Sequence, residues 1–486
     1  MSLSSKLPQL LGSFLALWAL ACGDSTGVTQ PALPHELRIV SGNHERGSIG
    51  SALSVPLRVR VVGSDTLPLE DVVVQWSVIE GQATLDPVQA PTNAAGETET
   101  RITFGETPGE LMVRASVENL TPVDFSITAV DPSVTQSFIA VSAGSSHTCG
   151  VTAAGTAYCW GENPFGQLGD GTTTERLTPA PVAEVASFVD VSALGARHTC
   201  GLTAAGAAYC WGQNQYGQLG DGSTTSRLTP VPVAGGLSFV ALSAGTLHTC
   251  GVTAAGAAYC WGGNTNGQLG DEPVQPSDRL TPSPVAGGLT FASVSARRFY
   301  SCGVTVEGAA YCWGDNEDGQ LGDGTTDQRL TPARVAGSVN FTSLSAGGLH
   351  TCGLTAPGVV YCWGSNPFGQ LGDGTTTQRS TPVQVASQVS FTAVSAGGSA
   401  TCGLAAAGAT YCWGDNGFGQ LGEGTTTQQM TPVPVAGELS FAVLSAGGSH
   451  ACGLAAAGIA YCWGSNRFGA LGDGTTTDRH MPTRVK

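Results

Sequence analysis

Fourteen of the fifteen cysteines could form covalent cross-links, because they fall into seven pairs with the spacing C-x9-C. A short turn such as residues 152–156 lies between the two members of each pair. In a three-residue hairpin loop, a type I turn followed by a left-handed glycine, both cysteines lie on one face of the hairpin. We therefore predict seven disulfides, each within one hairpin: Cys149–Cys159, Cys200–Cys210, Cys250–Cys260, Cys302–Cys312, Cys352–Cys362, Cys402–Cys412 and Cys452–Cys462.

Two alternatives compete with these disulfides. A two-residue turn would shift the strand register by one and place the two sulfurs on opposite faces. A zinc site would use cysteine spacings of about two to four residues and additional ligands, whereas each unit here offers only one nearby histidine. An even number of paired cysteines in an exported chain favours the disulfide framework.

Histidine stands two residues before the first cysteine of five pairs. A ring of metal ligands or catalytic bases is one interpretation of this pattern. The fourth and sixth units have Tyr300 and Ala400 instead, so the ring of imidazoles is incomplete. We expect a repeated structural hydrogen bond, in which imidazole bridges neighbouring backbones. The histidines are His147, His198, His248, His350 and His450.

In six units an acidic residue follows Leu-Gly and precedes Gly-Thr or Gly-Ser, and these acids could bind calcium. One carboxylate per loop falls short of the six to eight oxygens that calcium takes, and Asp-Gly is a common turn. We expect turns here and predict no metal and no cofactor. A nucleophile elbow, a phosphate loop and the H-E-x-x-H pattern are missing from the sequence, so any catalytic residues would have to be spread over several units. The acids are Asp170, Asp221, Asp323, Asp373, Glu423 and Asp473.

The positions of these residues repeat along the chain with a period of 50 to 52 residues. Alternating hydrophobic residues and turn signals divide each unit into four short strands. Seven four-stranded units predict an all-β fold, a seven-bladed β-propeller over residues 137–486. We expect the C-terminal strand 482–485 to complete the first blade, which would remove the free edges of an open array.

One motif in the repeat carries a family resemblance. It reads W-G-x-N-x-x-G-Q-L-G, begins at Trp160, and recurs six more times with one departure at Ala470. The chain resembles the regulator of chromosome condensation family. That resemblance implies a seven-bladed propeller, a fold that hosts unrelated activities. The founding member is an exchange factor for a nuclear GTPase, and exported propellers of this class bind proteins, among them a bacterial β-lactamase inhibitor.

Residues 35–131 alternate in the manner of an antiparallel sandwich. The segment V-x-W-x-V around Trp76, the turn at residues 93–96 and the final F-x-I-T-A resemble bacterial immunoglobulin-like domains of the invasin and intimin type. Expected strands cover residues 57–62, 72–78, 98–103, 111–117 and 125–129. The domain lacks the cysteines of antibody domains, so we expect a packed core around Trp76 and the role of a spacer.

The first residues indicate export. Residues 1–21 read as a signal peptide, with an apolar stretch too short to span a membrane comfortably. Its end resembles a lipobox, which predicts lipidation of Cys22, a tether over residues 22–34, and an outer-membrane lipoprotein of the bacterial cell envelope. The same residues fit an ordinary A-x-A cleavage site, so a secreted protein is the alternative.

The composition narrows the choice of partner. The chain of 486 residues carries 20 basic and 36 acidic residues, a net charge of −16, and its only lysines are Lys6 and Lys486. Proteins that follow the nucleic-acid backbone need clustered basic residues, so we expect no nucleic-acid partner. A hydrophobic fraction of 41% excludes general disorder.

Differences between the repeats point to a binding surface. The fourth unit has Arg297, Arg298, Phe299 and Tyr300 in place of Gly-x-x-His, and arginine and aromatic residues dominate interface hot spots. The third unit has a longer loop, Asp271–Asp278, which we expect to protrude. Drift in loops is the alternative explanation of both differences.

We therefore predict a monomeric, non-catalytic protein that binds a protein or glycan at the cell surface through its propeller loops. Only the lipid anchor would contact the membrane. Guanine-nucleotide exchange, as the family resemblance suggests, and a purely structural envelope scaffold are the two alternatives.

Overall fold

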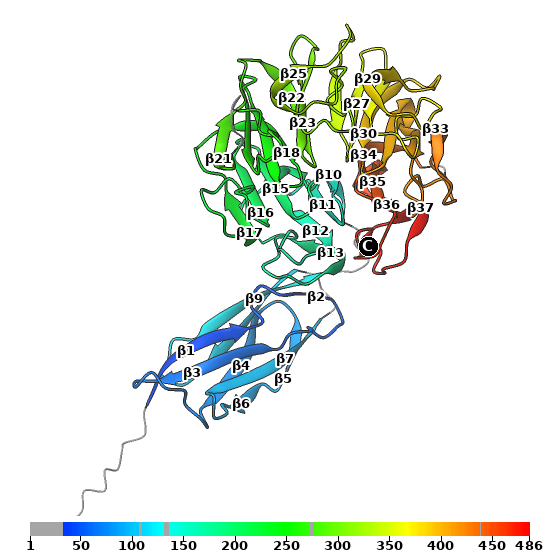
Figure 1. The fold of residues 1–486 in the computed structure, drawn as a ribbon. Helices are drawn as coiled ribbons and strands as arrows, with labels where there is room; N and C mark the ends of the chain where they lie inside the picture. Colours follow the sequence, from blue (N-terminus) through cyan, green and yellow to red (C-terminus); the bar gives the residue numbers. More distant parts are fainter. Residues whose placement is uncertain (1–32, 106–108, 131–135, 184, 272–276, 438) are drawn as a thin grey trace, which may run out of the picture. The chain divides into compact units, whose positions relative to one another are not determined.

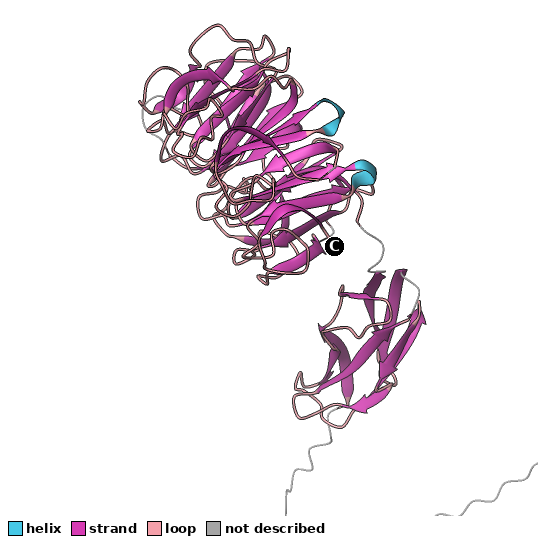
Figure 2. Ribbon diagram, turned by 90° about the vertical axis from the view of Figure 1, so that its right-hand side faces the viewer, coloured by secondary structure: helices cyan, strands magenta, loops and turns pink. Residues whose placement is uncertain are grey.

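A computed structural model describes residues 33–105, 109–130, 136–183, 185–271, 277–437 and 439–486 (Figure 1). The chain divides into two compact units, Met1–Val134 and Thr135–Lys486. Both consist of strands, and the helical segments of the described chain are two short turns, η1 (Ala406–Gly408) and η2 (Ala456–Gly458) (Figure 2). No helix in this part of the chain has the length and apolar character needed to cross a membrane. The predicted signal peptide, Cys22 and most of the tether lie outside the described residues.

The first unit contains two sheets. The four-stranded sheet has the order β1 (Pro34–Ser41), β3 (Leu57–Gly63), β7 (Glu97–Phe104), β5 (Ala83–Asp86). The five-stranded sheet has the order β2 (Arg46–Ser48), β9 (Val123–Val130), β8 (Gly109–Ser116), β4 (Val73–Glu80), β6 (Gln89–Pro91). All pairs are antiparallel except β2 with β9.

The two sheets of the first unit share one hydrophobic core. Alternate residues of their strands are buried, as in β7, because neighbouring side chains point to opposite faces of a sheet. Leu57 and Ile102 from one sheet meet Trp76 and Phe125 from the other. The rings of Trp76 and Phe125 lie 5.8 Å apart between centroids. The five strands expected from the sequence and the core position of Trp76 are confirmed.

The second unit contains seven four-stranded antiparallel sheets, which are the blades of a propeller. Blade 1 consists of β10 (Phe138–Ala143), β11 (His147–Thr152), β12 (Ala157–Gly161) and β13 (Arg176–Pro181). Blade 2 consists of β14 (Phe188–Ser192), β15 (His198–Thr203), β16 (Ala208–Gly212) and β17 (Arg227–Pro232). Blade 3 consists of β18 (Phe239–Ala244), β19 (His248–Thr253), β20 (Ala258–Gly262) and β21 (Arg279–Pro284). Blades 4 and 5 consist of β22 (Phe291–Arg297), β23 (Tyr300–Thr305), β24 (Ala310–Gly314), β25 (Arg329–Arg334); β26 (Ser343–Ala346), β27 (His350–Leu354), β28 (Val360–Gly364), β29 (Arg379–Gln384). Blades 6 and 7 consist of β30 (Phe391–Ala396), β31 (Ala400–Ala405), β32 (Thr410–Gly414), β33 (Gln429–Pro434); β34 (Phe441–Ala446), β35 (His450–Ala455), β36 (Ala460–Gly464), β37 (Arg479–Arg484).

The second and third strands of every blade form the hairpin that the cysteine spacing predicts. In blade 1, Cys149 lies directly opposite Cys159, and the turn between them closes with a hydrogen bond from Gly155 N to Thr152 O of 2.9 Å. Gly155 has a φ of +83°, the left-handed conformation that this loop requires of its last residue. The structure joins all seven cysteine pairs in disulfides, with Cα atoms 4.0 to 4.1 Å apart.

The first strands of the blades contact one another around the centre of the ring. A serine near the end of each first strand accepts a hydrogen bond from the backbone N–H of an alanine in the next blade, at 2.9 to 3.0 Å. The bond from Ala143 N to Ser445 Oγ connects blade 1 to blade 7, so this series of bonds is complete. The ring is therefore closed, and the last blade lies beside the first (Figure 1).

A second contact between blades joins the repeated motif to a tryptophan. The carbonyl of Gln167 in blade 1 accepts a hydrogen bond of 3.0 Å from Nε1 of Trp211 in blade 2. Gly169 lies so close to this indole that a Cβ atom there would come within 2.6 Å of Nε1, which explains the glycine of the motif. The same contact joins blade 1 to blade 7, where Nε1 of Trp160 donates to Ala470 O at 2.9 Å.

The expected completion of the first blade by strand 482–485 is wrong. β37 pairs with β36 of its own blade, and β13 already occupies the corresponding place in blade 1. The T-P-x-x-V segment pairs with the Tyr-Cys-Trp strand that precedes it, so each sequence unit is a whole blade. Closure therefore depends on contacts between side chains and loops, and no strand is exchanged.

The interface between blade 7 and blade 1 should contribute as much to the free energy of unfolding as the interface between blades 2 and 3. Replacing Ser445 by Ala leaves the buried N–H of Ala143 without a partner, and Ser192→Ala does the same to Ala244 within the ring. We expect each change to reduce the free energy of unfolding by about 1–3 kcal/mol, the cost of an unsatisfied buried donor. Urea denaturation of the two variants measures this loss. A much smaller loss for Ser445→Ala would show that the ring closes weakly.

Candidate functional site: the loop face of the propeller

Two sets of loops meet at one end of every blade, and we call the surface they form the loop face. One set connects the first and second strands, and the other connects the third and fourth strands. Backbone hydrogen bonds tie the two sets together, as from Glu162 N to Ser146 O at 3.0 Å and from Gln213 N to Arg197 O at 2.8 Å. The repeated polar residues and the variable residues singled out in the sequence lie on or beneath this face.

The repeated carboxylates hold the third-to-fourth-strand loops in shape. Asp170 accepts hydrogen bonds from the backbone and hydroxyl of Thr172 through Oδ1 and pairs with Arg176 through Oδ2 at 2.7 Å. Asn163 donates to the carbonyls of Thr172 and Thr174 in the same loop. Protein donors thus occupy the oxygens that calcium would need, and the described residues contain no cluster of three or more His, Cys, Asp or Glu that could hold a metal ion.

The electrostatics of these loops agree with that role. Desolvation alone would raise the pKa of Asp221, but hydrogen bonds from Ser223 and Arg227 outweigh it and lower the pKa below its ordinary value. The pKa values of Asp323, Asp373 and Asp473 are lowered by equivalent partners against the same desolvation. The carboxylates are therefore ionised and bound within their own loops at neutral pH.

The five histidines make a repeated hydrogen bond between blades. Nε2 of each lies 2.8 to 2.9 Å from the hydroxyl of a threonine or serine in the next blade. In the pair His147–Thr199, the hydroxyl donates its own proton to Gln167 O, so Nε2–H of the imidazole must be the donor. The expectation of a structural hydrogen bond is confirmed, but the partner is a side-chain hydroxyl rather than a backbone group.

Burial makes these imidazoles poor bases. Desolvation lowers the pKa of His147 to about 4 and the pKa values of the other four histidines to about 3. The side chains are at most 3% exposed, so no substrate reaches them. The histidines are neutral structural groups at physiological pH.

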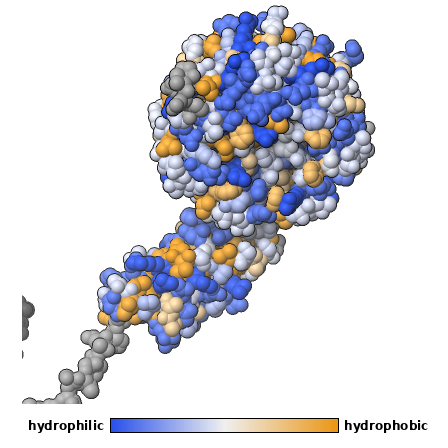
Figure 3. All heavy atoms as spheres, in the orientation of Figure 1, coloured by the Kyte–Doolittle hydropathy of each residue, from blue (hydrophilic) through white to orange (hydrophobic). Residues whose placement is uncertain are grey.

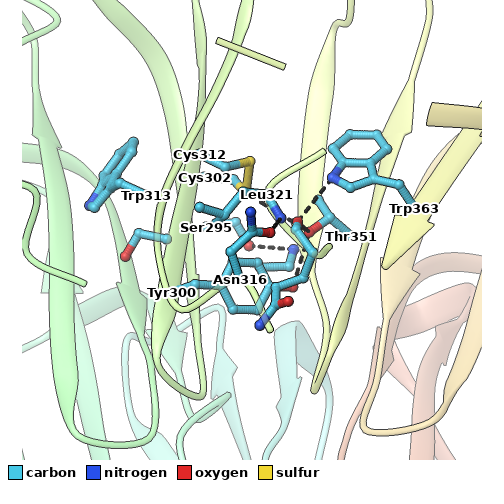
Figure 4. The surroundings of a disulfide bond; sticks show 12 residues. Ser295, Tyr300, Cys302, Cys312, Trp313, Asn316, Leu321, Thr351 and Trp363 are labelled. Atoms are coloured by element: carbon cyan, nitrogen blue, oxygen red, sulfur yellow. Dashed lines mark hydrogen bonds between the residues drawn. A yellow bond between two sulfur atoms is a disulfide. The ribbon is translucent and has the colours of Figure 1, made fainter. Parts of the chain in front are cut away.

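Two departures from this pattern keep the interfaces consistent. At the interface of blades 6 and 7, Ala400 replaces the histidine and Ala451 replaces its threonine partner, so both halves of the hydrogen bond are missing together. In blade 4, the hydroxyl of Tyr300 donates to His350 O at 2.6 Å and accepts from Gly347 N at 3.0 Å (Figure 4). Tyr300 thus bridges blades 4 and 5 in place of an imidazole.

The predicted binding cluster Arg297–Tyr300 is half wrong. Arg297 and Tyr300 are only 4% and 1% exposed, because the first points into the centre of the ring and the second fills the interface between blades. Arg298 is exposed and Phe299 half-buried, with the guanidinium carbon of Arg298 5.7 Å from the ring centroid of Phe299. The turn between β22 and β23 therefore presents two of the four residues to a partner.

Two further arginine–aromatic contacts lie on the loop face. Arg197 of blade 2 lies over Phe165 of blade 1 at 4.9 Å, and Arg467 lies over Phe468 in blade 7 at 5.1 Å. Both arginines are exposed. Arg197 directly precedes a repeated histidine, and Arg467 directly follows a repeated asparagine, so both stand next to positions that recur in every unit or nearly every unit.

Other aromatic residues of this face are open to solvent. Phe368 and Phe418 are 38% and 46% exposed, at the position equivalent to Phe165. Across the surface visible in Figure 3, hydrophobic residues are scattered among hydrophilic ones and form no single continuous patch. Residues 272–276 of the longer third-unit loop lie outside the described residues, and its end is held by a bond from Asn264 N to Asp278 Oδ1.

Comparison with known proteins identifies the family to which the repeats belong. A family model described as "Regulator of chromosome condensation (RCC1) repeat" matches residues 154–202, 205–252, 307–354, 357–404, 407–454 and 457–486, and a second model of the same description matches segments of all seven units between 138 and 470. The Arabidopsis thaliana ultraviolet-B receptor UVR8 is 31% identical over 192 residues, 38% of this chain and 43% of the receptor. The human E3 ubiquitin-protein ligase HERC2 is 30% identical over 193 residues, which are 4% of the ligase.

Solved structures show the same fold. Prp20p from Saccharomyces cerevisiae superimposes with a TM-score of 0.62 at 23% identity, covering 69% of this chain and 87% of Prp20p. At this identity the likeness demonstrates the propeller fold alone. The chain spans less than half the length of UVR8 and a small fraction of HERC2, so the activities of those proteins do not transfer with the match.

Acid should destabilise the propeller between pH 7 and pH 5. The buried histidines have pKa values of about 3 to 4, below the ordinary 6.5, so the unfolded chain takes up more protons as the pH falls. Their contribution to stability is complete above pH 6.5, and below it decreases by about 1.4 kcal/mol per histidine per pH unit. Urea midpoints at pH 7, 6 and 5 measure this slope.

His248→Gln is the matched control for this acid effect, because glutamine keeps a donor but does not titrate. We expect the variant to lose roughly one-fifth of the pH slope. The carboxylates with lowered pKa values remain ionised above pH 5 and do not contribute. An unchanged slope in the variant would contradict the assignment of the acid effect to these histidines.

Proposed function

Because the chain belongs to the family of regulator of chromosome condensation (RCC1) repeat proteins, we propose that it binds a protein partner through its loop face, without catalysis. One observation supports this function above others. The repeated histidines, asparagines and glutamines are buried between and within the blades, whereas the exposed residues that differ between units include three arginines placed over aromatic rings. Such pairs bury a large area and donate hydrogen bonds at small entropic cost, as interface hot spots do.

Capture of partners by the second unit, residues 135–486, tests this proposal. The test variant is Arg298→Ala with Phe299→Ala, which leaves the buried Arg297 and Tyr300 intact. The control is Val306→Ala with Glu307→Ala, two exposed residues in the turn that follows strand β23 at its other end. We expect a protein from envelope extracts to be retained by the parent and the control and lost from the test variant. Equal retention by all three, or retention of a glycan only, would contradict the proposal.

We further propose that the protein acts outside the cytosol, anchored by lipid at Cys22, with the first unit as an immunoglobulin-like spacer. The seven hairpin disulfides support export, since disulfides persist in oxidising compartments. The two sheets of the first unit over one core, with no cysteine between them, support a spacer held by packing alone.

Replacing Cys22 by Ser should release the protein from membranes if Cys22 carries the lipid, because a thioether-linked chain cannot form on serine. Fractionation of cells that express the two forms measures the change. We expect the parent in the membrane fraction and the variant in the soluble or unprocessed fraction. A parent protein found in the medium would indicate ordinary secretion, and one found in the cytosol would overturn export.

Guanine-nucleotide exchange is a second candidate, favoured by the structural likeness to Prp20p, which has been described with its binding to Gsp1p and histones. The measurement is the rate of GDP release from a nuclear GTPase with and without the second unit. Under non-catalytic binding we expect no acceleration. An acceleration that is lost on substitution of loop-face residues would establish exchange activity instead.

A further inference from the structure

Two phenylalanine rings on the loop face lack the arginine that covers their equivalent in blade 1. The three rings, Phe165, Phe368 and Phe418, follow the repeated Trp-Gly-x-Asn in blades 1, 5 and 6. The backbone N–H of each donates to the glutamine side chain two residues later at 2.9 to 3.0 Å, so each ring starts from the same loop conformation. Phe165 is half-buried, with the guanidinium carbon of Arg197 4.9 Å from its ring centroid. Phe368 and Phe418 are 38% and 46% exposed.

A shorter residue in the next blade accounts for this difference. Arg197 stands directly before the histidine position of its blade, and the same position holds Ser399 in the blade after Phe368 and Ser449 in the blade after Phe418. A serine side chain is too short to cover a phenyl ring. Both rings therefore have a face free for a cation from another molecule, the contact that the protein itself makes at this position in blade 1.

Blade 6 lacks a second arginine as well. In the other six blades, an aspartate of the third-to-fourth-strand loop pairs with the arginine that begins the fourth strand, as Asp473 does with Arg479 at 2.7 Å. Blade 6 has Glu423 and Gln429 at these two positions. Glu423 accepts a hydrogen bond from Nδ2 of Asn416 at 2.8 Å but forms no ion pair within the described part of the chain. Its negative charge is therefore not neutralised by an arginine.

The carboxylates of this loop lie beside its free ring. Glu423 is hydrogen-bonded to Asn416, which stands two residues before Phe418. Asp415 accepts a hydrogen bond of 3.1 Å from the backbone N–H of Gly417, the residue directly before Phe418. Among the residues that the structure describes, Asp415 likewise has no ion pair. One exposed phenyl ring and two partly exposed carboxylates are thus gathered on a single loop.

We propose that this loop of blade 6, residues 415–423, receives an arginine side chain from a basic segment of the protein partner. The guanidinium stacks on Phe418 and donates hydrogen bonds to Asp415 and Glu423, while Phe368 in blade 5 offers a second ring to the same segment. Arginine suits the loop better than lysine, because a planar guanidinium stacks through its face and donates through its edge at the same time. The net charge of −16 attracts a basic partner. The inference rests on the proposed function and specifies the chemistry of the partner.

A fluorescein-labelled hexa-arginine peptide is the probe, and its fluorescence anisotropy measures binding to the full chain. We expect saturable binding at physiological salt and weaker binding of hexa-lysine. Phe418→Ala removes the ring and should weaken the binding of hexa-arginine by about fivefold. Glu423→Asp combined with Gln429→Arg restores the ion pair of the other blades and should weaken binding by about tenfold or more, because the carboxylate is then occupied.

Two control variants separate this site from the general attraction of an acidic protein for a basic peptide. Phe165→Ala removes the equivalent ring of blade 1, which Arg197 already covers. Glu317→Gln removes an exposed carboxylate of blade 4 and changes the net charge by the same amount as Glu423→Asp with Gln429→Arg. Both controls should bind hexa-arginine as the parent does. Absence of saturable binding, equal affinities for the two peptides, or equal losses in test and control variants would overturn the site.

The capture experiment distinguishes failure of this inference from failure of the proposed function. The expected result is that Phe418→Ala, like Arg298→Ala with Phe299→Ala, fails to retain the protein that the parent retains. A protein retained by Phe418→Ala but lost from the other variant would support the proposed function and overturn the site on blade 6. If the parent captures no protein, the proposed function fails, and the peptide titration decides on the arginine site by itself.

Discussion

One hydrogen bond sets the geometry of the ring: the N–H of an alanine in one blade donates to a serine hydroxyl of the preceding blade. It occurs at all seven interfaces with distances of 2.9 to 3.0 Å, including the one that joins the last blade to the first. Because the alanine residues that donate are buried, a blade in the wrong position would leave a donor unsatisfied at considerable cost. The serine and alanine therefore fix the spacing of the first strands, and the tryptophan contacts further out follow from it.

This constraint explains why departures from the repeat come in pairs. Ala400 and Ala451 remove both partners of one hydrogen bond, which is cheaper than leaving a buried imidazole or hydroxyl unpaired. Arg297 and Tyr300 also change together, since a side chain at the glycine position would collide with a histidine ring. Each pair preserves the serine–alanine bond beneath it, as between Ser295 of blade 4 and Ala346 of blade 5.

The repeated polar residues serve the structure of the ring, and the variable exposed residues are the ones available to a partner. Histidine, aspartate, asparagine and glutamine have the chemistry of catalytic or metal-binding groups, yet in this ring they are held by neighbouring loops and blades. What remains for a partner is the set of residues that the frame does not need, such as Arg298 and Arg467 on the loop face. A rigid frame with variable exposed loops is an effective way to present a binding surface.

Much of the fold was determined by local sequence signals. The C-x9-C spacing with a glycine before the third strand specifies a three-residue hairpin loop and sets Cys149 opposite Cys159, because register follows from turn geometry. The period of about 50 residues, together with turn residues between short hydrophobic runs, specifies seven four-stranded blades. Alternation likewise located five strands of the first unit and the core position of Trp76.

The tertiary structure alone decided which strand pairs with which at the ends of the chain, and which variable residues are exposed. The T-P-x-x-V strand could have paired with the strand before it or with a strand of the next unit, because the order of the repeats along the chain is the same in both cases. Arg297 and Arg298 are adjacent and chemically identical, yet one is buried and the other is on the surface. The difference arises because ring closure brings Ala446, 149 positions away, within reach of Arg297, and a linear sequence holds no record of that distance.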